Sequence, residues 1–450
     1  MGILLRGGAL VFRDAVIEAD ILVENGKIAK VGKSIDSGYS RTVDLRGRLI
    51  LPGAVDPHIH GREPGLEYKD DFYHTTRAAV LGGVTTVLDM PNTVPPVDSP
   101  SRLLEKKFLL SRKSHTDFAL YAVLYDYSSD LETNIVELVR SGAIGFKAFM
   151  AQTTGNLPPP SFKTIYTALE LSQKLGFTVV FHAEDRECVE FFTSRVLASG
   201  GDSLRAHSDS RPPLCERLSI EHIVSIAEAV GGRAYIAHLS TASALKTIKR
   251  PRRSPTEIYV EVTPTYLFFD YEKHGNLGAL VKVNPPVRDS RNRMKLWRAI
   301  SRGLVDVVAT DHAPHAEHEK KVEFSKAAAG VASIQHLVPL MLTSALEGAI
   351  PIGRVVELCS ENPAKIFGLY PVKGSLLPGS DADIIAVDPS AEYVVSEETL
   401  EYKNKLTPYV GWKLKGKIDK VFLRGELVVD RGTIVVDRPS GKPLGREAKR

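Results

Sequence analysis

Short apolar runs of strand length alternate with amphipathic stretches of helical length between about residue 53 and residue 365. Several of the longer stretches end in glycine, which is typical of a helix C-terminus. Eight strands alternating with helices favour a parallel (β/α)8 barrel, an α/β fold of the TIM type. An open doubly wound sheet is the alternative, although no glycine-rich phosphate-binding motif follows any run. The eight runs are AVDPHIH, TTVLDM, FALYAVL, AIGFKAFM, TVVFHAE, RAYIAHLS, IYVEVTP and DVVATDHAPH.

Both ends of the chain have a different texture, with short alternating strands and tight turns. Near the N-terminus lie DILVENGKIAKVG and RTVDLRGRLILPG, and the pair Asn25-Gly26 is typical of a two-residue hairpin turn. The pattern returns in GSLLPGSDADIIAVDPS and KIDKVFLRGELVVDRGTIVV. We therefore expect residues 1–52 and 366–450 to form a small β-sandwich with a C-terminal tail, beside a barrel of residues 53–365.

Composition narrows the class of protein. Hydrophobic residues make up 43% and charged residues 25% of the chain, as in ordinary globular enzymes. No apolar run reaches the roughly 18 residues of a membrane span. The net charge is only +4, without a basic stripe carrying interleaved aromatics, so neither nucleic acid nor a membrane is expected as a partner. Three widely spaced cysteines, Cys188, Cys215 and Cys359, argue against a disulfide framework and for a reducing cytoplasm.

Polar side chains gather at the C-terminal ends of the predicted strands, where such barrels build active sites. Five of the 13 histidines lie on this predicted rim. His58 and His60 are two residues apart on the first strand, so both imidazoles point to the same face. Each pattern alone is weak, but joint placement at several strand ends predicts a metal site. The candidate ligands are His58, His60, Lys147, His182, His238 and Asp311.

Two of these candidates have special chemistry. An ammonium group at Lys147 would repel divalent cations, but carboxylation by CO2 would give a carbamate whose two oxygens could bridge a metal pair. The alternative for Lys147 is a barrel lysine paired with a carboxylate. Asp311 offers a hard anionic ligand that can also accept a proton from an activated water, so it is the candidate catalytic residue.

The segment DPHIHGREPGLEYKDDFYHTTRAAVLGGVTTVLDMPNTVPP (56–96) resembles the opening of dihydroorotases, in the cyclic amidohydrolase branch of the amidohydrolase superfamily. GAIGFKAFM, FHAE, AHLS, VNPPVR and ATDHAPH follow in the same order, and the resemblance extends over about residues 1–430. It implies a homo-oligomeric enzyme with two zinc ions and an association with aspartate transcarbamoylase. One zinc would be held by His58, His60 and Asp311, the other by His182 and His238, with carboxylated Lys147 bridging them.

The same resemblance implies reversible hydrolysis of dihydroorotate to N-carbamoyl-L-aspartate, a small-molecule step of pyrimidine synthesis. Arg62 would pair its planar guanidinium with the substrate carboxylate. The alternative for Arg62 is a surface ion pair with Glu63 or Glu67. The other implied substrate contacts are side chains of Asn92 and His315 and backbone groups near Asn284 and around Ala329-Gly330.

Two features keep other ring substrates open. Gly61 stands where many dihydroorotases have a bulky aromatic residue, and AAAGVASIQ (327–335) leans towards allantoinases. The alternatives are therefore an allantoinase, a hydantoinase or a dihydropyrimidinase, although Arg62 and Asn92 favour a ring that carries a carboxylate. A non-catalytic scaffold homologue is the alternative from another class, and it would have lost metal ligands that this chain retains.

Overall fold

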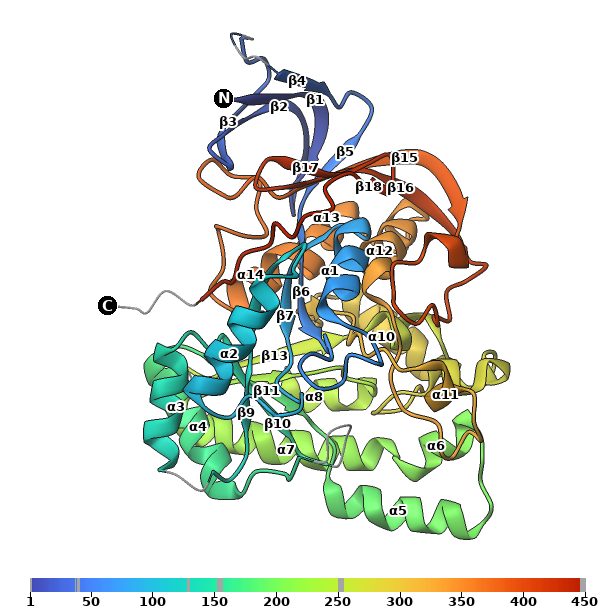
Figure 1. The fold of residues 1–450 in the computed structure, drawn as a ribbon. Helices are drawn as coiled ribbons and strands as arrows, with labels where there is room; N and C mark the ends of the chain where they lie inside the picture. The colour runs from blue at the N-terminus through green and yellow to red at the C-terminus, as the bar shows by residue number, and fades with distance from the viewer. Residues whose placement is uncertain are drawn as a thin grey trace.

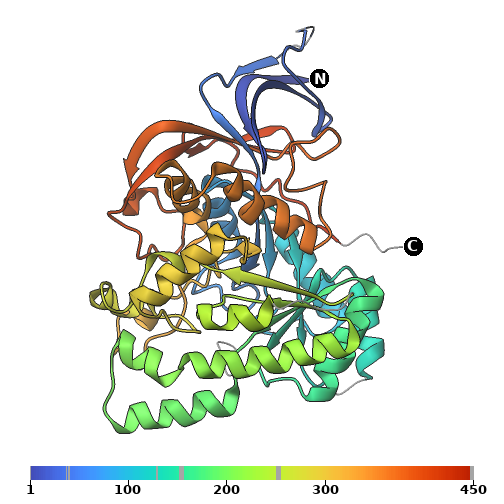
Figure 2. The same cartoon turned by 180° about the vertical axis from the view of Figure 1, so that it is seen from behind.

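The computed structural model describes residues 2–36, 38, 41–127, 130–151, 157–249 and 255–445. A barrel of parallel strands wrapped by helices forms one end of the molecule, and a strand-rich domain forms the other (Figures 1 and 2). The last residues of the expected tail, 446–450, lie outside the described residues.

Parallel strands pair in chain order around the barrel. The third predicted run is split at Tyr121 into two short strands, β8 and β9. A parallel bridge between Ile59 and His312 closes the ring, because it joins the first strand to the segment after the last one. The strands are β6 (Ala54–Ile59), β7 (Val84–Asp89), β8 (Asp117–Leu120), β9 (Ala122–Leu124), β10 (Gly145–Phe149), β11 (Thr178–His182), β12 (Arg233–Ile236), β13 (Glu257–Val262) and β14 (Val307–Val308).

Helices follow the barrel strands and cover their outer face (Figures 1 and 2). Side chains of Asp71, Ser99 and Ser161 cap helix N-termini, while Gly176 and Gly231 end helices with positive φ, as their sequence positions predict. The first helices are α1 (Phe72–Leu81), α2 (Pro100–Ser111), α3 (Leu131–Arg140), α4 (Phe162–Leu175), α5 (Arg186–Ala198), α6 (Leu204–Ser210), α7 (Pro213–Val230), η1 (Ala242–Ala244) and α8 (Leu245–Ile248). They are followed by α9 (Pro264–Phe268), η2 (Gly275–Val281), α10 (Ser290–Ser301), α11 (Glu317–Lys320), η3 (Ile334–His336), α12 (Leu337–Leu346), α13 (Ile352–Val356), η4 (Glu357–Glu361), α14 (Asn362–Ile366) and η5 (Glu397–Thr399).

Strands from both chain ends form one nine-stranded sheet in the order β18-β17-β16-β15-β5-β1-β2-β3, with β4 paired to β1. The antiparallel pairing of β15 with β5 joins the two ends. Asn25 and Gly26 form the predicted β2–β3 turn, with φ of 52° and 79°. The predicted barrel with a strand domain built from both termini is therefore confirmed. Its strands are β1 (Ile3–Val11), β2 (Val16–Glu24), β3 (Lys27–Gly32), β4 (Arg41–Asp44), β5 (Leu49–Pro52), β15 (Ile384–Val394), β16 (Lys413–Leu423), β17 (Glu426–Asp430) and β18 (Thr433–Ile434).

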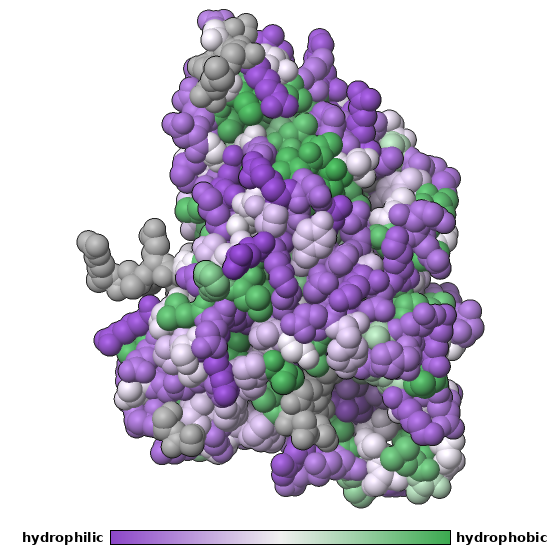
Figure 3. Space-filling model, in the orientation of Figure 1, coloured by the Kyte–Doolittle hydropathy of each residue, from purple (hydrophilic) through white to green (hydrophobic). Residues whose placement is uncertain are grey.

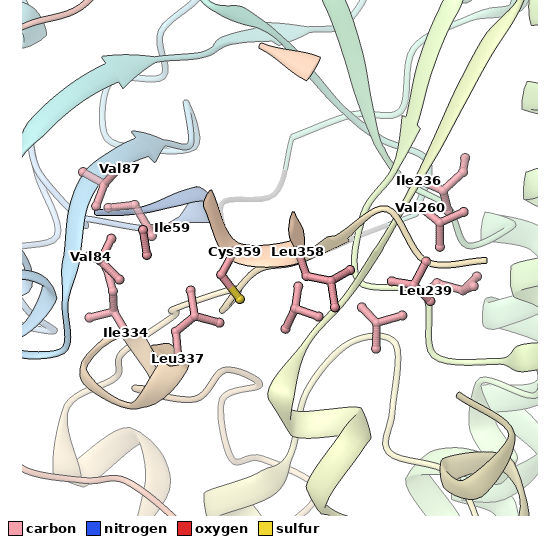
Figure 4. Close-up of a cluster of buried hydrophobic side chains, with 14 of the residues drawn as sticks. Ile59, Val84, Val87, Ile236, Leu239, Val260, Ile334, Leu337, Leu358 and Cys359 are labelled. Carbon is pink, nitrogen blue, oxygen red and sulfur yellow. The ribbon is translucent and has the colours of Figure 1, made fainter. Parts of the chain in front are cut away.

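The main hydrophobic core lies between the barrel strands and the surrounding helices. Figure 4 shows part of it, where Ile59 and Val87 from barrel strands lie near Leu337 of α12 and Cys359 of η4. Hydrophilic side chains cover most of the face drawn in Figure 3, and hydrophobic ones gather over the strand domain at its top. Among the described residues, no helix combines the length and the hydropathy needed to cross a bilayer.

A disulfide joins Cys188 in α5 to Cys215 in α7, with the Cα atoms 5.3 Å apart. The spacing of the cysteines argued against a disulfide framework, and this one bond contradicts that inference. The two residues are 27 positions apart in sequence, but the backbone N–H of Asp185 donates to the carbonyl of Cys215 and brings the N-terminal ends of both helices together. Such proximity depends on the packing of the helices, which cysteine spacing does not report.

A buried ion cluster joins the barrel to the strand domain. The Lys373 ammonium group, 1% exposed, pairs with Asp117 at the start of β8 and lies 2.9 and 2.8 Å from carboxylates of Asp381 and Asp383. Arg424 also pairs with Asp117. Because the three carboxylates lie close together, the two cations are needed to offset their repulsion.

We expect Lys373→Met to lower the free energy of unfolding by about 3–5 kcal/mol, because it leaves buried carboxylates without their central cation. Chemical denaturation followed by circular dichroism measures this effect. Lys420→Met is the matched control, because its pair with Asp430 is more exposed and should contribute less than about 1 kcal/mol. Equal losses in the two variants would contradict this account of the cluster.

Candidate metal centre and active site

A hollow at the C-terminal ends of the barrel strands brings the sequence candidates together. Side chains reach it from β6, β10 and β11 and from the loops that follow β7, β12 and β14. Among the candidates only His315 is absent from its lining. The lining includes His58, His60, Arg62, Asn92, Lys147, His182, His238, Asn284, Asp311, Ala329 and Gly330.

Three ligand atoms converge on one side of the hollow. The Nε2 atoms of His58 and His60 each lie 3.3 Å from Asp311 Oδ1. One ligand atom from each of the three residues lies within 4.8 Å of the others. Two imidazoles and a carboxylate in this arrangement suit a divalent transition metal such as zinc.

A second pair of imidazoles faces the same hollow. His182 Nδ1 and His238 Nε2 are 3.0 Å apart, and both side chains are buried. Lys147 on β10 lines the space beside them, with its Nζ 3.3 Å from His58 Nε2. In the described part of the chain Lys147 has no carboxylate within ion-pair distance, so the direct lysine–carboxylate pair of the alternative does not form, although the charges of Glu261 and Asp311 act on its amine.

In three of these imidazoles, the ring nitrogen that points away from the hollow lies at hydrogen-bond distance from a side-chain oxygen. Glu261 Oε1 lies 2.8 Å from His58 Nδ1, Glu184 Oε2 lies 2.8 Å from His182 Nε2, and Asn92 Oδ1 lies 2.8 Å from His60 Nδ1. This leaves the other ring nitrogen of each histidine turned towards the hollow, as in metal-binding histidines. Asn92 thus contacts a candidate ligand in addition to lining the hollow.

Glu184 and Glu261 are functional candidates that the sequence reasoning missed. Both carboxylates are fully buried. Arg211 pairs with Glu184, while Tyr235 Oη and the backbone N–H of His238 donate to Glu261. The signal for both was a carboxylate within an apolar strand run, in FHAE and IYVEVTP.

Burial sets the charge state of the site. Desolvation lowers the pKa of His58 and of His238 well below the ordinary value, so both imidazoles are neutral and able to bind metal. Burial also lowers the pKa of Lys147 to about 8. Burial by itself would raise the carboxyl pKa of Asp311. The neighbouring His58 and His60 outweigh this effect and hold that pKa well below its usual range. At neutral pH the neutral imidazoles and the ionised carboxylate of Asp311 therefore fit a cationic metal.

Strained backbone aims three of the site residues. Arg62, His238 and Asp311 have φ of 62°, 37° and 48°, and they are half of the six non-glycine residues with positive φ in the described part of the chain. Side chains rarely adopt this conformation unless the surrounding fold enforces it. The strain supports the inference that these sharp turns are kept because they orient the three side chains in the site.

Arg62 is buried beside the ligand cluster, with 3% of its surface exposed. Its Nε donates to the carbonyl of Pro314 at 3.0 Å. The alternative of a surface ion pair is wrong, because Glu63 pairs with Lys113 and Glu67 accepts from a backbone N–H. Within the described residues Arg62 has no carboxylate at ion-pair distance. Burial lowers its pKa to about 10, so it remains cationic at neutral pH.

The remaining substrate candidates lie differently. His315 is buried behind Arg62, 3.3 Å from the guanidinium, and does not line the hollow. The Gly330 N–H already donates to the carbonyl of Lys282, so this amide is not available to a ligand. Asn284 Oδ1 is buried without a hydrogen-bond partner among the described residues and lies in the lining.

Gly61 has a structural explanation. A Cβ atom at this position would lie 2.7 Å from the ring of Phe72 and 3.1 Å from Asp89 Oδ1. The Phe72 ring thus occupies the space beside residue 61. We infer that the glycine accommodates Phe72.

Removing the carboxylate that holds His58 should weaken metal binding. We expect Glu261→Gln to lower metal affinity about 10–100-fold, because the ring of His58 and the backbone N–H of His238 lose the carboxylate that accepts from them. Competition with a chromophoric chelator measures the affinity. Glu216→Gln is the matched control, since this buried carboxylate bonds Ser240 and touches no candidate ligand. Unchanged affinity in Glu261→Gln, or the same loss in the control, would contradict the assignment.

Comparison with known proteins is consistent with this geometry. Residues 49–428 match the amidohydrolase family. An allantoinase from Rubrobacter xylanophilus is 33% identical, with 98% of this chain and 96% of that protein covered. A dihydroorotase from Methanosarcina acetivorans is 34% identical, with coverage of 96% and 91%. The solved structure of L-hydantoinase from Arthrobacter aurescens superposes with a TM-score of 0.95 at 30% identity, covering 99% of each chain.

Proposed function

Because the chain belongs to the amidohydrolase family, we propose that it is a dihydroorotase, which interconverts dihydroorotate and N-carbamoyl-L-aspartate. The observation that carries the proposal is the buried guanidinium of Arg62, which lines the same hollow as the metal-binding candidates and has no carboxylate partner there. The charges of nearby carboxylates such as Asp311 and Glu319 offset part of the cost of burying Arg62. None of them pairs with it directly in the described part of the chain, so a ligand carboxylate could form that pair. Among the ring substrates considered, dihydroorotate carries such a carboxylate, whereas allantoin, hydantoin and dihydrouracil do not.

The donor set fits two zinc ions. His58, His60 and Asp311 would hold one, His182 and His238 the other, and Lys147 would bridge them as a carbamate. The environment of Lys147 supports this role, because its amine is buried among imidazoles with no carboxylate at ion-pair distance in the described part of the chain, and burial lowers its pKa to about 8, which increases the fraction of neutral amine that can react with CO2. When bound, the metal pair would activate a water and polarise the amide carbonyl.

The residues of the chain would bind, orient and exchange protons. Arg62 binds the ring carboxylate and thereby fixes which amide faces Asp311. Asp311 stays ionised, so a carboxylate oxygen can accept the proton of the attacking water and pass it to the amide nitrogen as the C–N bond breaks. In the reverse direction Asp311 takes the proton from the carbamoyl nitrogen, and water leaves as the ring closes.

A substrate panel tests the proposal. The purified, metal-replete protein is assayed with dihydroorotate, allantoin, hydantoin and dihydrouracil. We expect kcat/KM for dihydroorotate to exceed the others by about 10⁴-fold, because a site built for a charged group discriminates against rings that lack it. Preference for allantoin, hydantoin or dihydrouracil would replace the dihydroorotase assignment with the corresponding cyclic amidohydrolase. Absence of turnover with all four would favour a non-catalytic homologue.

The family resemblance supports two further proposals about assembly. We propose that the chain forms a homo-oligomer and that it associates with aspartate transcarbamoylase. Light scattering of the purified protein tests the first. Co-purification of the two proteins from the same cells tests the second.

A further inference from the structure

A second hollow lies on the outer wall of the barrel, between α8 and α10. Its volume is about 390 Å³, which is within the range of small-molecule pockets. It shares no lining residue with the active-site hollow. Apolar side chains form part of its lining, and they are Ala242, Leu245, Ala299 and Leu304. The rest of the lining is cationic, and consists of Lys246, Lys249, Lys295, Arg298 and Arg302.

The charge of this hollow is largely uncompensated. Lys249 pairs with Asp306 at 2.6 Å. The other four cations are exposed, and none of them lies within ion-pair distance of a carboxylate in the described part of the chain. No acidic side chain contributes to the lining. An anionic ligand would therefore meet positive charge on both walls.

The cations that line this hollow repel one another when no ligand is bound. Lys295, Arg298 and Arg302 are spaced three and four residues apart at α10 and its C-terminus, so like charges lie on one side of the helix. The helix dipole stabilises the last two of these, near the C-terminus, but not Lys295. Lys246 adds a further cation from α8. A bound anion would offset this repulsion.

The two walls of the hollow are held together independently of any ligand. Asn292 of α10 accepts a hydrogen bond from the backbone N–H of Ala242 at 3.0 Å and donates to the carbonyl of Ser240 at 2.6 Å. These bonds fix α10 against the segment that leads into α8. A preformed hollow lowers the entropy lost when a ligand binds.

We propose that this hollow binds a phosphorylated small molecule of the nucleoside polyphosphate class. The cations would hold the phosphates, and the apolar side chains would contact the sugar and base. A nucleic acid is less favoured, because its binding surfaces carry aromatic side chains on which bases stack, and the lining contains none.

Isothermal titration calorimetry on the metal-replete protein at physiological salt tests this proposal. The probes are ATP, inorganic triphosphate and adenosine. We expect ATP to bind more tightly than triphosphate and adenosine not to bind. The double variant Lys295→Gln/Arg298→Gln should bind ATP at least tenfold more weakly. The matched control is Arg140→Gln/Lys163→Gln, which removes two exposed cations on α3 and α4 that form no ion pair with the described residues, and it should leave affinity unchanged.

Three results would overturn the proposal. One is the absence of ATP binding at millimolar concentration. The second is an equal loss of affinity in both double variants, which would indicate nonspecific electrostatic attraction. The third is unchanged affinity in both double variants, which would place bound ATP elsewhere, for example at the active-site metals. If the first result is accompanied by binding of a single-stranded oligonucleotide, the hollow would be a nucleic-acid surface instead. Because calorimetry does not require turnover, the result is independent of the proposed dihydroorotase activity.

Discussion

The Asp311→Asn variant is expected to keep its fold and its metal but to lose about 10³-fold in kcat. The amide oxygen of asparagine can still act as a ligand, whereas an amide cannot accept the proton of the attacking water. Steady-state kinetics with dihydroorotate, together with metal analysis by mass spectrometry, measures both properties.

Asp70→Asn provides the control for this prediction. Asp70 is fully buried, its carboxylate does not line the hollow, and burial raises its pKa to about 7. We expect the control to retain activity within a few-fold. Near wild-type turnover in Asp311→Asn would remove the proton-transfer role from Asp311, and loss of metal from this variant would show that its role is ligation.

Arg62→Gln should lower kcat/KM for dihydroorotate by about 10³-fold, because the ring carboxylate loses its buried cationic partner. Hydantoin is the internal control, since it carries no carboxylate. Any slow turnover of hydantoin by the same variant should change less than tenfold. Parallel losses with both rings would mean that Arg62 supports the structure of the site rather than recognising the substrate.

The sequence predicted the barrel because its periodicity is local. Runs such as TVVFHAE carry the strand signal, and glycines such as Gly176 mark the helix ends where the structure has them. The convergence of His58, His182 and His238 on one hollow also followed from sequence, because strand ends in a barrel meet on one rim.

Contacts between distant segments could not be predicted in this way. The Cys188–Cys215 disulfide depends on how α5 packs against α7, and the link from Glu261 to His58 joins strands β13 and β6. Whether Arg62 pairs with a neighbouring glutamate was open from sequence, and its burial beside Pro314 decided the question. Each of these depends on tertiary packing rather than on local pattern.

The most direct measurement of the central claim is activity followed alongside metal content. The enzyme is stripped by a chelator, returned stepwise to zinc and assayed with dihydroorotate, and a His58→Ala/His238→Ala variant is treated in the same way. We predict that activity disappears with the metal and returns in proportion to the zinc regained, while the variant neither holds zinc nor recovers. Full turnover by metal-free enzyme, or a wild-type zinc content in the variant, would contradict the account.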